Sequence, residues 1–138
     1  MRVVARRQPS ADGSLGFAHE VEIEGGHKVR IDEPVSAGGG DTGPSPTRLL
    51  AASLVACTAV TIEMYAGRKG WDLGAVEVDA DVAYDGHAPT TFEVTLHLPE
   101  SLSDEQRKRL LAIAGRCPVH RALSGETEVT IRDRVEAL

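Results

Sequence analysis

The chain has 138 residues, with 15 Lys and Arg against 21 Asp and Glu, and a formal net charge of −6. This length fits one domain over residues 1–138, and 41% hydrophobic with 26% charged residues excludes a disordered chain. The acidic balance argues against nucleic acid or an anionic membrane as a partner. Two cysteines exclude a secreted disulfide scaffold, and the first residues lack the apolar core of a signal peptide. We therefore expect a cytoplasmic protein with reduced thiols.

The first third of the chain shows the period-two pattern of β-strands. Residues 17–24 and 27–32 alternate between apolar or histidine side chains and charged ones, and Gly25-Gly26 separates them. This pattern predicts a β-hairpin with one solvent-facing side, preceded by a short strand over residues 3–6. The Gly-rich stretch 37–44 that follows lacks the ending of a phosphate-binding loop, so we interpret it as a plain connector.

A long apolar helix is predicted next. Ser45 is a good helix cap, Pro46 suits the first helical position, and residues 49–62 carry no charge on any side of a helix. The pattern predicts a buried central helix over about residues 46–67 that ends at residues 69–70. Because the 14-residue uncharged run is shorter than the roughly 18 residues that span a membrane, we expect no membrane partner. One small sheet covers only one side of such a helix, which predicts a homodimer.

The remaining elements alternate between strands and a helix. Alternating residues predict strands over 76–84 and 92–98, joined by a loop at 85–89, and a last strand that carries Val129 and Ile131. A capping box at residues 103–106 predicts a second helix through Ala114. The order β-β-β-α-β-β-α-β indicates an α+β protein, with a mainly antiparallel sheet around the long helix.

Cys57 is the first candidate for chemistry. A free cysteine within an apolar helix is most often an inert core residue, because burial disfavours the charged thiolate. A reactive thiolate at this position requires a cation from another element. Arg48 lies on the opposite face of the same helix, so Arg30, on the preceding strand, is the better candidate.

Cys117 has a different setting. Pro118 at a first helical position makes Cys117 the cap of a new short helical turn, whose N–H groups, with His120 and Arg121, favour a thiolate. The negative end of the preceding helix opposes ionisation, and the sequence leaves both readings open. Cys117 and His120 form only half of a zinc site, so we expect no metal and no cofactor.

These motifs together resemble the OsmC/Ohr family, in the general OsmC-like branch that carries Cys-Pro-Val-His. The resemblance rests on Cys57 and on Asp32-Glu33-Pro34, Gly43-Pro44-Ser45-Pro46, Leu49-Leu50-Ala51-Ala52, Met64-Tyr65-Ala66, Arg68-Lys69-Gly70-Trp71 and Cys117-Pro118-Val119-His120-Arg121. It implies an intertwined α+β homodimer with two central helices and with active sites at the dimer interface.

The resemblance also implies a reaction. Cys57 would be the thiol that attacks an organic hydroperoxide, Cys117 would resolve the product to a disulfide, and a dithiol reductant would regenerate both. In the peroxidase branch an acidic residue follows the helix-starting proline and pairs with the activating arginine, whereas Thr47 stands there in this chain. The alternatives are a non-catalytic dimer that binds a small apolar ligand, and a thiol redox sensor.

Overall fold

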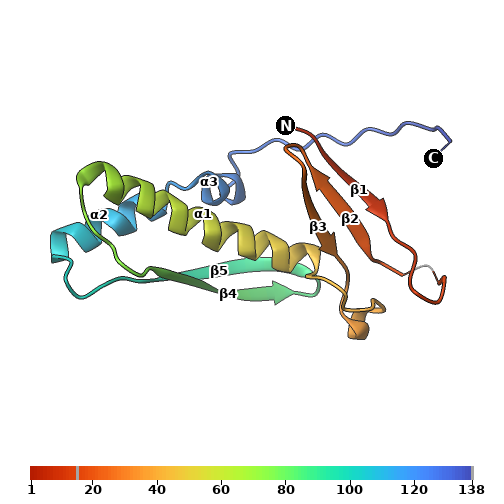
Figure 1. Cartoon of the computed structure of the whole chain (residues 1–138), viewed down its shortest axis with the longest axis horizontal. Coiled ribbons are helices and arrows are strands. Elements are labelled where there is room, and N and C mark those ends of the chain that lie inside the picture. Colours follow the sequence, from red (N-terminus) through yellow and green to blue (C-terminus); the bar gives the residue numbers. More distant parts are fainter. Residues whose placement is uncertain (15, 138) are drawn as a thin grey trace. The chain divides into compact units, whose positions relative to one another are not determined.

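The structure is a computed structural model that describes residues 1–14 and 16–137. In chain order it contains β1 (Val3–Arg7), β2 (His19–Ile23), β3 (His27–Ile31), the short 3-10 helix η1 (Val35–Ala37), α1 (Pro46–Lys69), β4 (Glu77–Asp85), β5 (Ala88–His97), α2 (Asp104–Ala114) and α3 (Pro118–Leu123) (Figure 1). The predicted α+β class is confirmed.

The chain divides into two compact units, residues 1–52 with 82–92 and residues 53–81 with 93–138, which we describe separately. The single-domain organisation stays a prediction.

The first unit contains the antiparallel sheet β1-β2-β3. Val21 pairs with Val29 on one side and with Ala5 on the other. The turn between β2 and β3 falls at Gly25 and Gly26, whose φ angles of 105° and 86° glycine adopts without a steric penalty. The predicted hairpin is therefore confirmed.

The polar side of this sheet carries ion pairs between neighbouring strands. Arg6 on β1 lies 2.6 Å from Glu22 on β2, and Lys28 on β3 lies 2.9 Å from Glu20. The hydrogen bond from Arg6 lowers the pKa of Glu22, and the hydrogen bond to Glu20 raises the pKa of Lys28. Because these side chains are exposed, they mark the predicted solvent-facing side and contribute little to stability.

The Gly-rich stretch after β3 is a folded loop that lies on the end of that strand. Asp41 donates its backbone N–H to the carbonyl of Glu33 at 3.0 Å. A Cβ atom on Gly39 would lie 1.9 Å from the carbonyl oxygen of Glu33, and one on Gly43 would lie 2.5 Å from that of Arg30. Glycine is required at both positions, so the loop is more than the plain connector that we interpreted from the sequence.

Asp32 organises this loop from its interior. The side chain is buried, and its Oδ2 atom accepts hydrogen bonds from the backbone N–H of Gly40 at 3.2 Å, from that of Thr42 at 3.1 Å and from the Thr42 hydroxyl at 2.7 Å. Its Oδ1 atom accepts from the Glu33 N–H at 2.8 Å. These bonds, led by that of the Thr42 side chain, lower the pKa of the Asp32 carboxyl.

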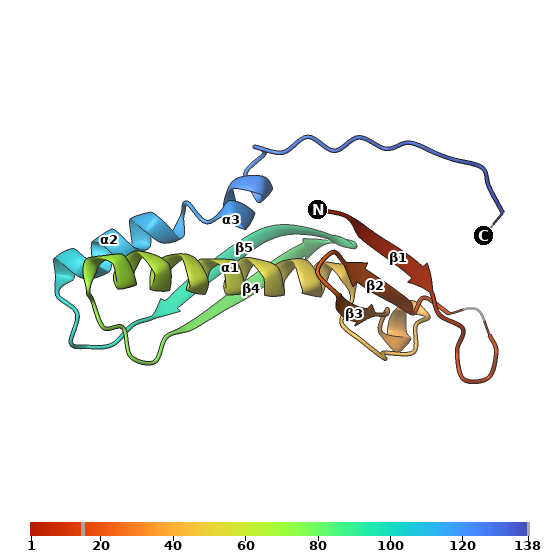
Figure 2. The same cartoon turned by 45° about the horizontal axis from the view of Figure 1, so that its top comes forward.

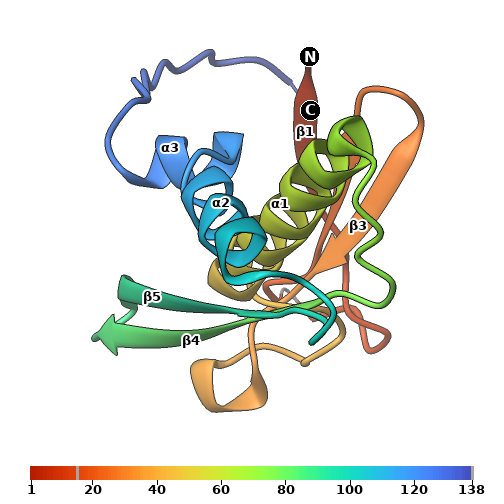
Figure 3. The same cartoon turned by 90° about the vertical axis from the view of Figure 1, so that its left-hand side faces the viewer.

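The second unit is built on one stripe of α1. The buried residues of this helix lie four apart, which places them on one face: Leu54, Thr58, Ile62 and Ala66. Leu110 and Ala114 of α2 pack in the same core, together with partly buried side chains from the ends of β4 and β5. Within this unit α1 and α2 lie next to each other on one face of the hairpin (Figure 3).

As expected from the sequence, the single chain covers only one side of α1. Val60 and Met64, on the side away from the stripe, are 52% and 55% exposed. One sheet and one short helix cover only one face of a long helix. By length and composition alone, α1 is the one helix among the described residues that could cross a membrane, a test that the core helix of a soluble protein also passes.

The β4–β5 hairpin is tighter and longer than predicted. Gly86 has a left-handed φ of 59°, and β5 already begins at Ala88, so two residues replace the expected five-residue loop. The helix α2 begins as predicted with a capping box. Gln106 donates its N–H to the Ser103 hydroxyl at 3.1 Å, and Ser103 donates its N–H to the Gln106 side chain at 2.9 Å.

The predicted last strand is wrong for the single chain. In place of a strand, the described residues after α3 run in an extended path, and Val129 and Ile131 are 81% and 91% exposed (Figure 2). A strand requires a neighbouring edge that exchanges backbone hydrogen bonds with it. Among the described residues, the two sheets pair only β1 with β2, β2 with β3 and β4 with β5, so this segment is part of neither sheet.

We expect Asp32→Asn to destabilise the protein, because the amide group of asparagine would face the N–H donors of the loop. Since the folded state lowers the pKa of Asp32, its stabilisation is fully present above the unfolded value of about 3.9 and is lost as pH falls through the lowered value. Thermal unfolding from pH 3 to pH 8 would show the gap between wild type and variant closing toward low pH. Asp85→Asn, at the exposed end of β4, is the charge-matched control. Equal melting temperatures at neutral pH would contradict this role.

Candidate active site

Cys117 caps the short helix α3. Its Sγ accepts a hydrogen bond from the backbone N–H of His120 at 3.2 Å, Pro118 occupies the first turn, and the side chain is fully buried. This confirms the cap predicted from the sequence. The sulfur is therefore held in one place by backbone geometry rather than by side-chain packing alone.

Thr58 on α1 is the second contact of this sulfur. Its Oγ1 lies 3.7 Å from the Cys117 Sγ and donates to the carbonyl of Leu54 at 2.9 Å. A threonine hydroxyl has one proton, and the shorter bond to Leu54 uses it. The Thr58 oxygen therefore keeps a lone pair with which it can accept a hydrogen bond from the Cys117 thiol.

The sequence analysis did not identify Thr58. That analysis considers only a cation for Cys57, whereas Thr58 contacts Cys117, which lies 59 positions further along the chain. The sequence signal that could have identified Thr58 is its hydroxyl, which lies in the stripe of otherwise apolar residues spaced four apart on α1. Such a buried hydroxyl requires hydrogen-bond partners, because burying it without them costs free energy.

Cys57 directly precedes Thr58 on α1. It is half-buried, and both cysteines are free thiols. Consecutive Cα atoms are about 3.8 Å apart, and successive side chains on a helix diverge by about 100°. The two cysteines therefore approach the same turn of α1, while Cys57 points to a neighbouring face of the helix. A disulfide between them would require a local rearrangement.

Arg30 lies in the first unit, and its guanidinium is held by the Gly-rich loop. Its Nε donates to the Thr42 hydroxyl at 3.0 Å, and that hydroxyl donates to Asp32 at 2.7 Å. The two terminal nitrogens of the guanidinium are then the donors that an anion would meet. Cys57 belongs to the second unit, and the role of Arg30 at this thiol stays a prediction.

Thr47 occupies the position of the carboxylate in the peroxidase branch. Its Oγ1 accepts a hydrogen bond from the Tyr84 hydroxyl at 3.4 Å, and Ser45 accepts from the Arg48 N–H at 3.4 Å as the predicted helix cap. The start of α1 is thus lined by neutral hydroxyls. Tyr84, on β4, is a further member of this end of the helix that the sequence analysis did not identify.

The fold and these two thiols define a small α+β protein with a candidate dithiol site. Residues 38–132 match the family model described as OsmC-like protein, and the chain belongs to this family. The match covers α1, both cysteines and the β4–β5 hairpin. A comparison with curated proteins gives no match.

Solved structures with the same fold span most of this chain. The OsmC-like protein from Mycoplasma pneumoniae has 16% identity and a TM-score of 0.72, over 90% of this chain and 86% of that one. A putative osmotic stress induced and detoxification response protein from Psychrobacter arcticus has 23% identity and a TM-score of 0.68, over 86% and 85%. OhrB of Bacillus subtilis, an organic hydroperoxide resistance protein, has 25% identity and a TM-score of 0.58, over 90% of both chains.

We expect the two thiols to differ in reactivity in the native protein. Cys57→Ser leaves only the fully buried Cys117, whereas Cys117→Ser leaves only the half-buried Cys57. Reaction with an aromatic disulfide reagent should be at least about tenfold slower for Cys117, because its sulfur becomes accessible only through local opening.

The control is the same pair of reactions in denaturant, where the two rates should converge. If native Cys117 reacts as fast as native Cys57, the sulfur is not sealed as the structure indicates.

Proposed function

We propose that this chain is a thiol peroxidase that reduces organic hydroperoxides through Cys57 and Cys117. The observation that carries the proposal is the contact of 3.7 Å between the Cys117 sulfur and Thr58, the residue after Cys57, which brings both thiols to one turn of α1. Two further observations support the proposal. The chain belongs to the OsmC-like family, and its structural relative OhrB of Bacillus subtilis is named an organic hydroperoxide resistance protein.

The reaction has three steps. The Cys57 thiolate attacks one peroxide oxygen, the O–O bond breaks, and the products are a Cys57 sulfenic acid and an alkoxide that takes up a proton to become an alcohol. The Cys117 sulfur then attacks the sulfenic sulfur, so that an S–S bond forms and the oxygen leaves as water. A dithiol reductant exchanges with this disulfide, returns both thiols and becomes a disulfide itself.

The contacts of Cys117 give it a resting and a reacting position. At rest its sulfur lies 3.7 Å from the Thr58 hydroxyl and accepts a hydrogen bond from the His120 N–H. The second step requires the sulfur to leave Thr58 and turn toward Cys57. The helix α3 has six residues, of which Val119 alone is half-buried and the others are exposed, so a movement of this short helix breaks few contacts.

Arg30 is the proposed cation that activates Cys57. A thiolate in an apolar helix requires a positive group nearby, and the guanidinium of Arg30 is oriented by Thr42 and Asp32. Asp32 is ionised at neutral pH because its pKa is lowered, so it fixes the arginine without competing for a proton.

A cytoplasmic homodimer is part of the proposal. The exposed apolar side chains in the second unit include Val60, Met64 and Leu111, at 52%, 55% and 57%, and a second copy of the chain would cover them. A second copy also offers a sheet edge for the unpaired segment that carries Val129 and Ile131. Both features support association of two chains.

We expect Cys57→Ser to abolish turnover of an alkyl hydroperoxide with a dithiol reductant, because it removes the attacking sulfur. Cys117→Ser should keep the first oxidation, visible as a sulfenic acid trapped by a cyclic diketone, and should stop recycling. Turnover of the peroxide and mass spectrometry of the protein measure the two effects.

The same mass spectrometry separates the alternatives. Undiminished turnover in Cys57→Ser would contradict the proposal. If one equivalent of organic peroxide leaves both wild-type thiols free, binding of an apolar ligand is the better explanation. If a disulfide forms but the protein does not recycle efficiently, a thiol redox sensor is the better explanation.

We expect Arg30→Ala to slow oxidation of Cys57 by about 10- to 100-fold, because the thiolate loses its cation. The measurement is stopped-flow oxidation in the Cys117→Ser background, with the pH dependence of thiol reactivity as a second readout, which should move to higher pH. Arg6→Ala removes an arginine on the neighbouring sheet surface and should leave both readouts unchanged. If Arg30→Ala and Arg6→Ala have equal effects, the proposed role of Arg30 in activating Cys57 is contradicted.

A further inference from the structure

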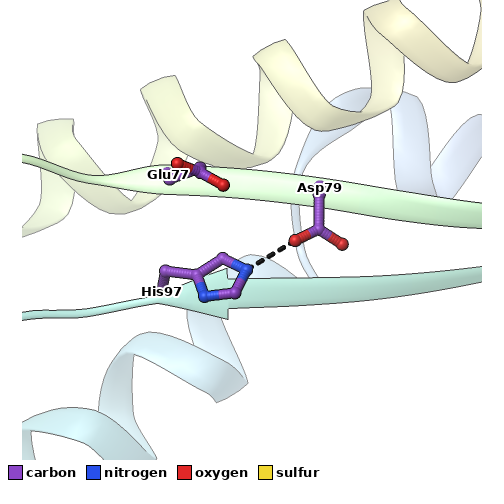
Figure 4. A group of neighbouring side chains, drawn as sticks. All are labelled: Glu77, Asp79 and His97. Carbon is purple, nitrogen blue, oxygen red and sulfur yellow. Dashed lines mark hydrogen bonds and ion pairs between the residues drawn. The ribbon is translucent and has the colours of Figure 1, made fainter.

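Three potential metal ligands converge at one end of the β4–β5 hairpin, within the second unit. Glu77 and Asp79 are two apart on β4, so their side chains lie on the same side of the strand, and His97 is the last residue of β5 (Figure 4). One ligand atom from each lies within 4.8 Å of those of the other two. His97 Nε2 and Asp79 Oδ2 are 2.5 Å apart.

We propose that Glu77, Asp79 and His97 bind a divalent transition-metal ion, of which Zn²⁺ is the representative. Bonds of about 2.0–2.2 Å in a tetrahedral site place the ligand atoms of zinc about 3.3–3.6 Å apart. In the structure, the His97 and Asp79 ligand atoms are closer than this, at 2.5 Å, and all three ligand atoms lie within 4.8 Å of one another. Shifts of about 1 Å by exposed side chains are sufficient to reach the spacing of zinc ligands, because these side chains change rotamer freely.

The donor set selects the class of metal. An imidazole nitrogen with two carboxylates suits zinc and its transition-metal neighbours, whereas Mg²⁺ and Ca²⁺ prefer oxygen ligands throughout. Three protein ligands leave a fourth position for water, which the exposure of the site allows. The site belongs to no step of the proposed peroxidase reaction, and its test is independent of that reaction.

The local charge favours a cation. Among the described residues, no lysine or arginine forms an ion pair with Glu77 or Asp79, and the partner of Asp79 is His97. The hydrogen bond that His97 donates to Asp79, followed by the charges of Asp79 and Glu77, raises the pKa of His97. A metal ion at this site would therefore meet two carboxylates that no lysine or arginine neutralises among the described residues. Its binding would replace the one contact between Asp79 on β4 and His97 on β5 with three metal bonds.

Titration calorimetry with ZnCl₂ on the full chain tests the site, at about pH 8 so that proton competition is weak. We expect one zinc per chain at this site, and at least about tenfold weaker binding in His97→Gln and in Asp79→Asn. His87→Gln, at the turn of the same hairpin, is the matched control and should bind within about twofold of wild type. Mg²⁺ at the same concentration should give no comparable binding.

Zinc also binds thiolates, so the same titration is made on the Cys57→Ser, Cys117→Ser double variant. The His97-dependent binding should persist there. Equal binding in His97→Gln and wild type, loss of all binding in the cysteine variant, or equal binding of Mg²⁺ would each overturn the proposal. If the double variant does not fold, the absorption of bound Co²⁺ answers the question, because thiolate ligation gives an intense near-ultraviolet charge-transfer band that nitrogen and oxygen ligands do not.

Discussion

The burial of one stripe of α1 is the constraint on which the second unit depends. Ile62 of α1 and Leu110 of α2 are both fully buried, and both belong to the hydrophobic core of this unit. Truncating a side chain of this kind to alanine typically costs about 2–5 kcal/mol, a large part of the stability of a small domain. The same stripe carries Thr58. The packing that holds α1 in place thus also determines where the dithiol site lies.

The surroundings of Cys117 show which of two neighbouring helix ends its sulfur faces: the carbonyl end of α2 or the N–H end of α3. The sequence places this residue both after the carbonyl end of α2 and before the N–H end of α3. In the structure the backbone N–H groups of Arg116 and Cys117 bond to the carbonyls of Ile113 and Ala114, at 2.9 Å and 3.3 Å. The carbonyl end of α2 is therefore occupied by backbone, and the sulfur faces the N–H of His120. The backbone thus turns the side chain away from the end of α2 and toward the first turn of α3.

Much of this fold could be predicted because its signals are local. The period-two pattern identifies β2 and β3, the capping box identifies the start of α2, and Pro118 identifies Cys117 as a cap. The contact between Thr58 and Cys117 could not be predicted, because it depends on how α3 packs against α1. The missing strand has the same origin: Val129 and Ile131 have the strand pattern, but a strand also depends on pairing with a distant segment, and they join neither sheet.

The start of α1 shows a second arrangement that the motifs alone do not reveal. The resemblance implies that, in the peroxidase branch of the family, a carboxylate at the position of Thr47 pairs with the activating arginine. In this chain Thr47 is neutral and bonds to Tyr84, while Arg30 is bonded through the Thr42 hydroxyl to the buried carboxylate of Asp32. A carboxylate one hydroxyl away still attracts and orients the guanidinium, but it does not occupy the terminal nitrogens. The Gly-rich loop thus holds the carboxylate that orients Arg30, and the close approach of Gly39 and Gly43 to the backbone of residues 30–33 sets the shape of that loop.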